Sequence, residues 1–78
     1  MDKAVHELDT SGLSCPLPVL KLKQSLRHLA GGEVLHVIAT DKGTVHDFAA
    51  FSRQTGHELI ESRESEGKFH YWFRKRSE

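Results

Sequence analysis

The sequence predicts an α+β fold, a two-layer sandwich in which two helices cover one face of a four-stranded mixed sheet. Three observations support this prediction: two amphipathic stretches with a helical period, apolar β-branched or alternating stretches around them, and glycines at the turns between. The order along the chain is β-α-β-α-β-β. Because β-α-β crossovers are right-handed, both helices are expected on the same face, and the other face is open to solvent.

The first strand is expected from Val5 to Asp9, and it ends in the turn-forming Thr10-Ser11-Gly12. A helix of about four turns follows Cys15. Its apolar stripe has intervals of three and four residues and consists of Val19, Leu22, Leu26 and Leu29. Gly31-Gly32 is predicted to end this helix, since glycine readily adopts the left-handed conformation of a C-terminal cap.

Glu33 to Thr40 is mostly apolar and rich in β-branched residues, so we expect an interior strand there. The next helix lies in "DKGTVHDFAAFSRQTG", where Thr44 and Asp47 resemble a capping box and Gly56 ends the helix. Its inner face is expected to consist of Val45, Phe48, Ala49 and Ser52.

Two final strands, Glu58 to Arg63 and Lys68 to Arg74, are predicted to form a hairpin with Gly67 in its turn. The second of them alternates, so Phe69, Tyr71 and Phe73 share one face, and His70, Trp72 and Arg74 share the other. On the open face of the sheet, Trp72 and His36 are expected to be partly exposed. An exposed aromatic side chain there is either a docking surface or an isolated apolar residue.

Length and composition predict a single domain over residues 1–78, with a small core and no deep cavity. Eleven basic and eleven acidic residues give zero net charge, and the basic run Arg74-Lys75-Arg76 is short, so no direct nucleic-acid partner is expected. No apolar run approaches the length of a membrane span, and the start of the chain lacks the apolar core of a signal peptide. A single cysteine fits a reducing, cytoplasmic location.

That cysteine lies in "GLSCPLPVL", Gly12 to Leu20, between a glycine and two prolines. Proline is tolerated in the first turn of a helix, so Pro16 is predicted at the first helical position and Pro18 at the third. Cys15 would then be the cap, with the free backbone donors of the first turn pointing at its sulfur. A helix N-terminus lowers the pKa of a cysteine, and the thiolate is the form that attacks sulfur.

Several other chemistries lack the residues that they require. A cysteine hydrolase needs a base and a pocket, yet no histidine neighbours Cys15 in the sequence, and a thioredoxin-type centre needs a second cysteine. No histidine pair has the spacing of a structural zinc site, so neither a metal nor another cofactor is expected. The remaining use of Cys15 is to accept a chemical group and pass it on. The alternative is a buried structural cysteine that only caps the helix.

Charged residues near this segment have two interpretations each. Lys21, Lys23 and Arg27 on the outer face of the first helix are either a solvated surface or a positive rim that attracts acidic partners or stabilises an anionic persulfide. Asp9 and Asp41, at predicted strand ends near Cys15, serve either in partner docking or in turns and caps.

The stretch "LDTSGLSCPLPVLKLKQSL", Leu8 to Leu26, resembles the Cys-Pro-x-Pro signature of the TusA/SirA-like family of small sulfur-carrier proteins. The resemblance covers essentially the whole chain, with further matches at Gly31–Asp41, Asp47-Phe48, Gly56–Leu59 and "YWFRK". It implies the same β-α-β-α-β-β sandwich. It also implies that Cys15, with Gly12, Pro16 and Pro18 around it, receives sulfane sulfur as a persulfide from a cysteine desulfurase or a rhodanese-like donor. An acceptor protein then takes the sulfur.

In the best-known branch of that family the sulfur reaches the 2-thiouridine of tRNA, and other branches serve sulfur oxidation, molybdenum cofactor supply or selenium metabolism. Two departures bear on the branch: Lys42 stands where the family often has proline, and Ser52 where some members have a second cysteine. Two other functions compete with the carrier. One is a non-catalytic interaction module that uses the open sheet and Trp72, and the other is a thiol-dependent enzyme with its own turnover.

Overall fold

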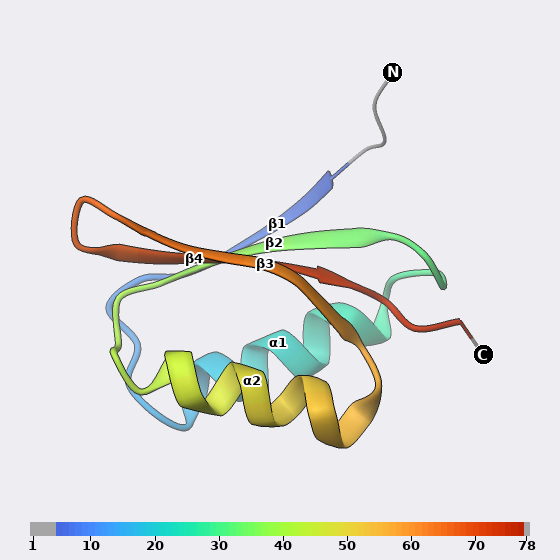
Figure 1. Ribbon diagram of the computed structural model, residues 1–78, viewed down its shortest axis with the longest axis horizontal. Coiled ribbons are helices and arrows are strands. Elements are labelled where there is room, and N and C mark those ends of the chain that lie inside the picture. The colour runs from blue at the N-terminus through green and yellow to red at the C-terminus, as the bar shows by residue number, and fades with distance from the viewer. Residues whose placement is uncertain (1–4, 78) are drawn as a thin grey trace.

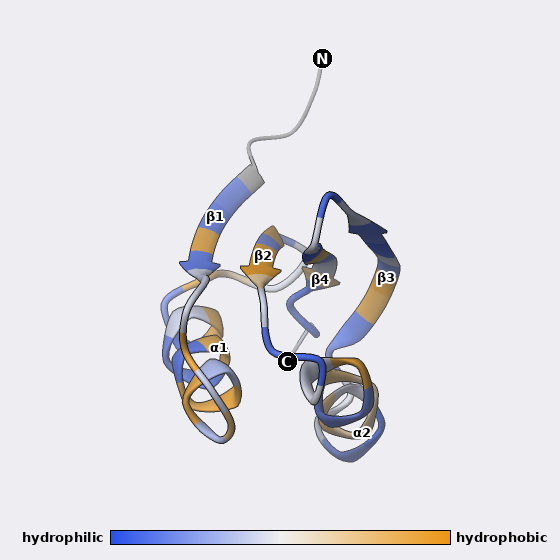
Figure 2. Ribbon diagram, turned by 90° about the vertical axis from the view of Figure 1, so that its left-hand side faces the viewer, coloured by the Kyte–Doolittle hydropathy of each residue, from blue (hydrophilic) through white to orange (hydrophobic). Residues whose placement is uncertain are grey.

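The structure is a computed structural model that describes residues 5–77. Its elements are β1 (Val5–Thr10), α1 (Leu17–Arg27), β2 (Val34–Ala39), α2 (Thr44–Thr55), β3 (Glu58–Ser65) and β4 (Lys68–Arg74). The strand order is β1-β2-β4-β3, with β1 parallel to β2 and the other pairs antiparallel. Both helices lie side by side under one face of the sheet (Figures 1 and 2). The predicted fold class is confirmed.

The core lies between the helices and the sheet. Strand β2 alternates as predicted, and its Leu35, Val37 and Ala39 are buried against the helices. Phe48 of α2 is fully buried, and its ring meets the edges of two β4 rings, Tyr71 at 4.6 Å and Phe73 at 5.8 Å between centroids. Edge-to-face pairs of this kind stabilise a core beyond the area they bury. This aromatic cluster fixes α2 beneath β4.

Helix α1 begins later and ends earlier than the sequence predicts. Pro16 is its N-cap and not its first residue, so Pro18 occupies the second helical position, and the Cys15–Pro16 peptide bond is cis. The helix ends at Arg27 with His28, at φ −92°, as its C-cap. No left-handed glycine caps the helix there, and the Lys75 ammonium group donates to the Leu26 carbonyl oxygen in its last turn.

The predicted capping box of α2 is also wrong. Gly43 is the N-cap, and no side chain caps the helix. The Thr44 hydroxyl instead donates to the carbonyl oxygen of Asp41 (2.8 Å) and lies 2.8 Å from the hydroxyl of Tyr71. Because Thr44 is buried under β4, its hydroxyl has partners in the core and does not turn back to Asp47. The side chain of Asp47 is therefore available elsewhere.

The inner face of α2 is rotated relative to the prediction. The helix buries Thr44, Phe48 and Phe51, whereas the side chain of Val45 is 54% exposed. Its end agrees with the prediction, since Gly56 is a left-handed C-cap with φ +86°. The β3–β4 hairpin has a two-residue turn in which Glu66 and Gly67 both have positive φ, as a type I′ turn requires.

The helix-free face of the sheet is covered by its own side chains. The rings of His36 and Trp72 are parallel, with centroids 4.6 Å apart, and Arg63 lies 5.1 Å from the centre of the Trp72 ring. His36 also shares hydrogen bonds with Glu7 (3.1 Å) and His70 (2.9 Å). Trp72 and His36 are partly exposed, as the sequence predicts. Within residues 5–77, no helix is both long and apolar enough to cross a bilayer.

Candidate functional site

Cys15 lies in the loop between β1 and α1, at the edge where two parallel strands end together. The loop after β1 and the loop after β2 meet there because the carboxyl ends of parallel strands share one edge of a sheet. Two hydrogen bonds join the loops: the Gly12 N–H donates to the Thr40 hydroxyl (2.8 Å), and the Cys15 N–H donates to Asp41 Oδ2 (2.9 Å). Gly12 has φ +83°, a conformation that favours glycine. The exposed cysteine is therefore held by its backbone.

Asp41 acts on the backbone of this site. One carboxylate oxygen accepts the Cys15 N–H, and the other accepts the N–H of Gly43 at 3.3 Å. A single side chain thus connects the loop that carries the thiol to the start of α2. The structure brings Asp41 to Cys15, as the sequence suggested for this edge, whereas the other carboxylate considered there, Asp9, accepts the N–H of Ser11 in its own turn.

The pKa of the Cys15 thiol is raised above its ordinary value, contrary to the sequence-based expectation. The largest cause is a hydrogen bond between the thiol and the side chain of Asp47, followed by partial desolvation and then by the charges of Asp47 and Asp41. The expected effect of the helix N-terminus is weakened because Cys15 precedes the N-cap, and the Leu17 N–H donates to the carbonyl oxygen of Ser14 (2.9 Å). The surroundings of Cys15 therefore favour its neutral thiol over the thiolate.

Asp47 is the site residue that sequence reasoning missed. Its spacing from Thr44 indicated a local capping partner, and that local signal concealed its position in the first turn of α2, opposite the loop of Cys15. Only the packing of α2 beside α1 places Asp47 and Cys15 on the same groove. One sequence signal could have identified Asp47 as a site residue. It is an acidic residue in the first turn of α2, and its side chain does not cap that helix.

The thiol opens into a groove between the two helices, with a volume of about 380 Å³. Its walls carry apolar side chains from both helices and five polar ones besides Cys15: Lys23, His46, Asp47, Gln54 and Thr55. Of the three predicted rim cations, only Lys23 lines this groove, and Lys21 is exposed on α1 away from it. A groove this open admits a side chain presented by another protein but does not enclose a substrate.

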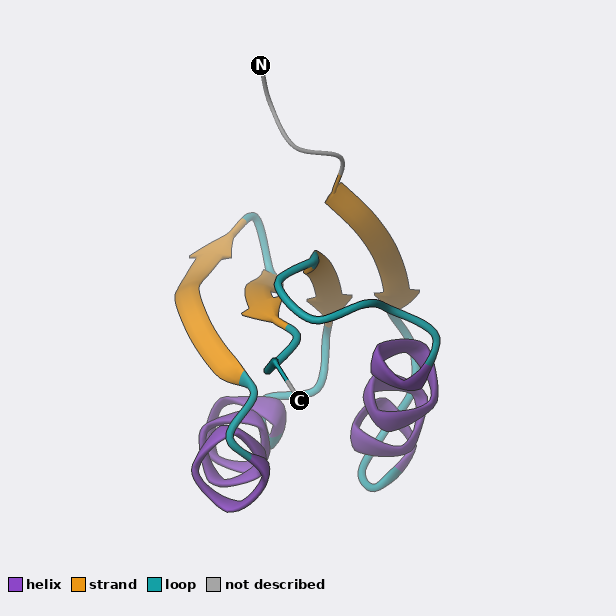
Figure 3. Cartoon of the chain, turned by 90° about the vertical axis from the view of Figure 1, so that its right-hand side faces the viewer, coloured by secondary structure: helices purple, strands orange, loops and turns teal. Residues whose placement is uncertain are grey.

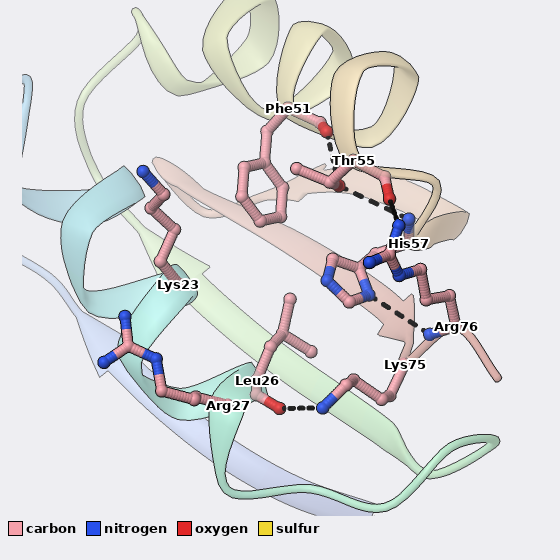
Figure 4. Close-up of a pocket in the computed structure, with 8 residues that line it drawn as sticks. All are labelled: Lys23, Leu26, Arg27, Phe51, Thr55, His57, Lys75 and Arg76. Atoms are coloured by element: carbon pink, nitrogen blue, oxygen red, sulfur yellow. Dashed lines mark hydrogen bonds between the residues drawn. The ribbon is translucent and has the colours of Figure 1, made fainter. Parts of the chain in front are cut away.

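A second hollow of about 230 Å³ adjoins the groove at the other end of the helices (Figure 4). The two share the lining residues Lys23, Phe51 and Thr55. Arg27, the third predicted rim cation, lies here. The Lys75 ammonium group donates to two carbonyl groups at the end of α1, those of Leu26 (2.7 Å) and Leu29 (2.9 Å), and the Arg76 guanidinium donates to the Thr55 carbonyl of α2 (2.7 Å).

The described residues contain no cluster of three or more side chains able to hold a metal ion. The geometry instead presents one exposed cysteine, an acidic side chain, Asp47, on the same groove, and a groove that is open to solvent. This arrangement suits the transfer of a small group between proteins.

Comparisons with known proteins agree with this geometry. The family model described as sulfurtransferase TusA matches residues 6–75. The chain is 59% identical to a sulfur carrier protein TusA of Allochromatium vinosum, over 90% of this chain and 92% of that protein. It is 48% identical to a sulfur carrier protein TusA of Pseudomonas putida, over 91% and 89% of the two chains.

A SirA-like protein from Desulfitobacterium hafniense has the same fold, with a TM-score of 0.80 over 95% of this chain and all of that one, at 21% sequence identity. This likeness concerns the arrangement of helices and strands (Figure 3). The family follows from the sequence matches, which extend across both helices and all four strands. The chain belongs to the TusA family of sulfurtransferases.

Proposed function

We propose that this protein is a sulfur carrier that holds sulfane sulfur as a persulfide on Cys15 and passes it to an acceptor protein. The observation that carries the proposal is the position of the one cysteine, exposed at the start of an interhelical groove on a loop fixed by Asp41. Relatives named as sulfur carriers extend over nine tenths of the chain, which supports the same role here.

Two displacement steps at sulfur describe the relay. In loading, the Cys15 thiolate attacks the outer sulfur of the donor's persulfide, the donor's sulfur–sulfur bond breaks, and the donor cysteine leaves with the electron pair and takes up a proton. In delivery, a thiolate of the acceptor attacks the outer sulfur of the Cys15 persulfide, and Cys15 leaves in the same way. No electrons are gained or lost overall, so neither step requires a redox cofactor.

The partners are expected to be proteins that insert a cysteine into the open groove. The family resemblance implies a cysteine desulfurase or rhodanese-like donor. It implies 2-thiouridine in tRNA or the product of a related sulfur-trafficking pathway as the destination, reached through the acceptor protein and without direct binding of RNA. Lys23, in the groove, is the cation best placed to contact an anionic persulfide or an acidic partner. A reducing cytoplasm suits this unpaired thiol.

The test is to incubate the protein with a cysteine desulfurase and cysteine and to record its intact mass. Wild type is expected to gain one sulfur atom that a reductant removes, and Cys15→Ser is expected to gain none. Ser14→Ala, a change at the neighbouring exposed position, is the matched control and loads like wild type. No adduct on wild type, or the same adduct on Cys15→Ser, would contradict the proposal.

The competing function is an interaction module on the open sheet, motivated by the partly exposed Trp72 and its stack with His36. Pull-downs with Cys15→Ser and Trp72→Ala separate the two functions. Under the carrier proposal the cysteine variant loses sulfur transfer while Trp72→Ala retains it. Full function in the cysteine variant would favour the interaction module.

A further inference from the structure

We propose that the interhelical groove binds an extended segment of the partner protein and positions an acidic side chain of that segment at its cationic end. The cysteine of the segment lies at Cys15, and the acidic residue lies about four or five positions away along the segment. This inference rests on the proposed function, in which the partner exchanges sulfur with Cys15.

The groove follows both helices from one end to the other. On α1 its lining residues lie three or four positions apart, which places them in one stripe along the helix. They are Pro16, Val19, Lys23 and Leu26, and Arg27 adjoins the last of them. A matching stripe on α2 ends at Thr55. Because the helices lie side by side (Figure 3) and the two hollows share lining residues, the hollows form one continuous groove.

The two ends of this groove differ in charge. Asp47 lines the end at Cys15, and Asp41 accepts the Cys15 N–H beside it. At the other end, the described lining residues include four cations and no carboxylate. A segment that is acidic only at the far end therefore has a favourable orientation in the groove, and one that is acidic next to its cysteine does not.

Two of the four cations are free to bind a partner. Lys75 and Arg76 already donate to carbonyl groups at the ends of the helices. The Lys23 ammonium and the Arg27 guanidinium are exposed and have no hydrogen-bond or ion-pair partner within residues 5–77. They lie four positions apart, on the α1 side of the hollow (Figure 4). Together they can donate to a carboxylate without breaking a contact of the fold.

The length of the groove sets the spacing in the partner. Pro16 and Leu26 are ten positions apart, which is about 15 Å along a helix. An extended chain covers that length in roughly four or five residues. The lining between the ends includes Val19, Ala50 and Phe51, so apolar side chains suit the intervening positions. The partner segment is therefore a cysteine and an acidic residue separated by a short apolar stretch.

Synthetic peptides that react with Cys15 test this spacing without any persulfide. Each peptide has one cysteine, activated as its 2-pyridyl disulfide, in a run of alanine and leucine that contains two adjacent glutamates before or after the cysteine. The Cys15 thiolate attacks the peptide sulfur, a disulfide between peptide and protein forms, and pyridine-2-thiol leaves with the electron pair. Its release gives the rate, which is divided by the rate with a small thiol to remove differences between the peptides.

The rate is expected to depend on the position of the glutamates. At low salt, glutamates at the fourth and fifth positions from the cysteine should accelerate the reaction roughly two- to fivefold relative to glutamines there, in one of the two chain directions. Glutamates next to the cysteine should slow it, because they meet Asp47 and Asp41. Equal rates for all peptides, or the largest acceleration with the adjacent glutamates, would overturn the inference.

Matched variants connect the effect to the cationic hollow. Lys23→Gln and Arg27→Gln should each reduce the acceleration, and the double variant should abolish it. Lys21→Gln, an exposed change of the same charge on α1 outside the groove, should retain it. Arg27→Glu is expected to favour lysines over glutamates at the fourth and fifth positions. Full acceleration in the double variant would contradict the inference, provided that circular dichroism shows every variant to be folded.

The same peptides separate this inference from the proposed function, because the reaction uses the empty carrier. Uniform peptide rates overturn the inference even when a desulfurase loads Cys15 with sulfur. Failure of loading together with the expected peptide preference would instead contradict the carrier function. Stronger inhibition by single-stranded RNA than by a cysteine-free glutamate peptide of equal charge would identify a phosphate-binding site, and the inference would fail.

Discussion

The two ends of the interhelical groove carry side chains of opposite charge with different roles. At the C-terminal ends of α1 and α2, Lys75 and Arg76 donate to carbonyl groups of the last turns, where positive charge also complements the helix dipole. At the other end, the first turn of α1 has no acidic residue, and Asp41 and Asp47 act on the backbone and the thiol of Cys15. Cations stabilise the fold at one end, and carboxylates govern a reactive sulfur at the other.

The largest effect on stability is expected at the cationic end. Lys75→Met keeps most of the side-chain volume but removes the ammonium group that donates to the carbonyl oxygens of Leu26, in α1, and Leu29, just beyond it. We expect the free energy of unfolding, measured with urea, to fall by about 2 kcal/mol, the range for hydrogen bonds to a charged group. Sulfur loading of the folded protein should be unchanged. A loss of sulfur loading without a loss of stability would contradict a purely structural role for Lys75.

At the carboxylate end, Asp41→Ala removes the acceptor of two backbone N–H groups that are close to solvent. The expected loss of unfolding free energy is about 1 kcal/mol, because water replaces part of the interaction. The same variant should lower the pKa of the Cys15 thiol, measured by alkylation against pH, but by less than Asp47→Asn does, since the charge of Asp41 is the smallest cause of the shift. The opposite order would contradict the distinct roles of the two aspartates.

Lys23 lines both hollows, so it connects the two ends, whereas Lys21 lines neither. Replacing Lys23 with Gln is expected to slow loading from a protein donor by roughly twofold at low salt, and Lys21→Gln, with the same charge change, should have no effect. The difference should disappear at high salt, because salt screens exposed charges. Equal slowing by both variants would indicate a general effect of net charge.

The smallest expected effect is a pH dependence at the cationic end. The pKa of Glu33 is held below its ordinary value of 4.5, chiefly because its carboxylate accepts the N–H of Ala30. A lowered folded-state pKa contributes stability above the unfolded value, and that contribution is lost as pH falls through the folded value. Urea midpoints of wild type and Glu33→Gln should therefore differ slightly at pH 7 and converge as the pH falls below 4.5 and through the folded-state pKa. A gap that widens in acid would contradict this assignment.

Periodicity was sufficient to predict the fold, and two of the details predicted wrongly, the end of α1 and the cap of α2, lie where single side chains make long-range contacts. The strands and the last cap, Gly56, depend on local patterns, and they agree with the prediction to within one or two residues. At the end of α1, the Lys75 ammonium group donates to the carbonyl oxygen of Leu26, 49 residues away in the sequence. The Thr44 hydroxyl meets Tyr71 in the core, and this contact overrides the local capping rule. A long-range contact made by a single side chain produces no periodic pattern in the sequence, so periodicity cannot predict it.

The same distinction applies to the site. The motif around Cys15 was sufficient to predict which residue carries the chemistry, because proline, glycine and cysteine act locally there. The direction of the thiol pKa shift was predicted wrongly, since it depends on Asp47 of α2, which only the packing of the two helices brings to the sulfur. The expected effect of the helix N-terminus on the thiol pKa is outweighed by the nearby carboxylate of Asp47.

The most direct test of the account follows one sulfur atom onto Cys15 and off again. A desulfurase loads the protein with sulfur from cysteine that contains isotopically heavy sulfur. One portion of the loaded protein is digested and mapped by peptide mass spectrometry, and the other portion is treated with excess small thiol. We predict heavy sulfur on the peptide that contains Cys15 and nowhere else, and its complete transfer to the thiol with Cys15 left unmodified. Heavy sulfur on another peptide, or label that the thiol cannot remove, would contradict the account.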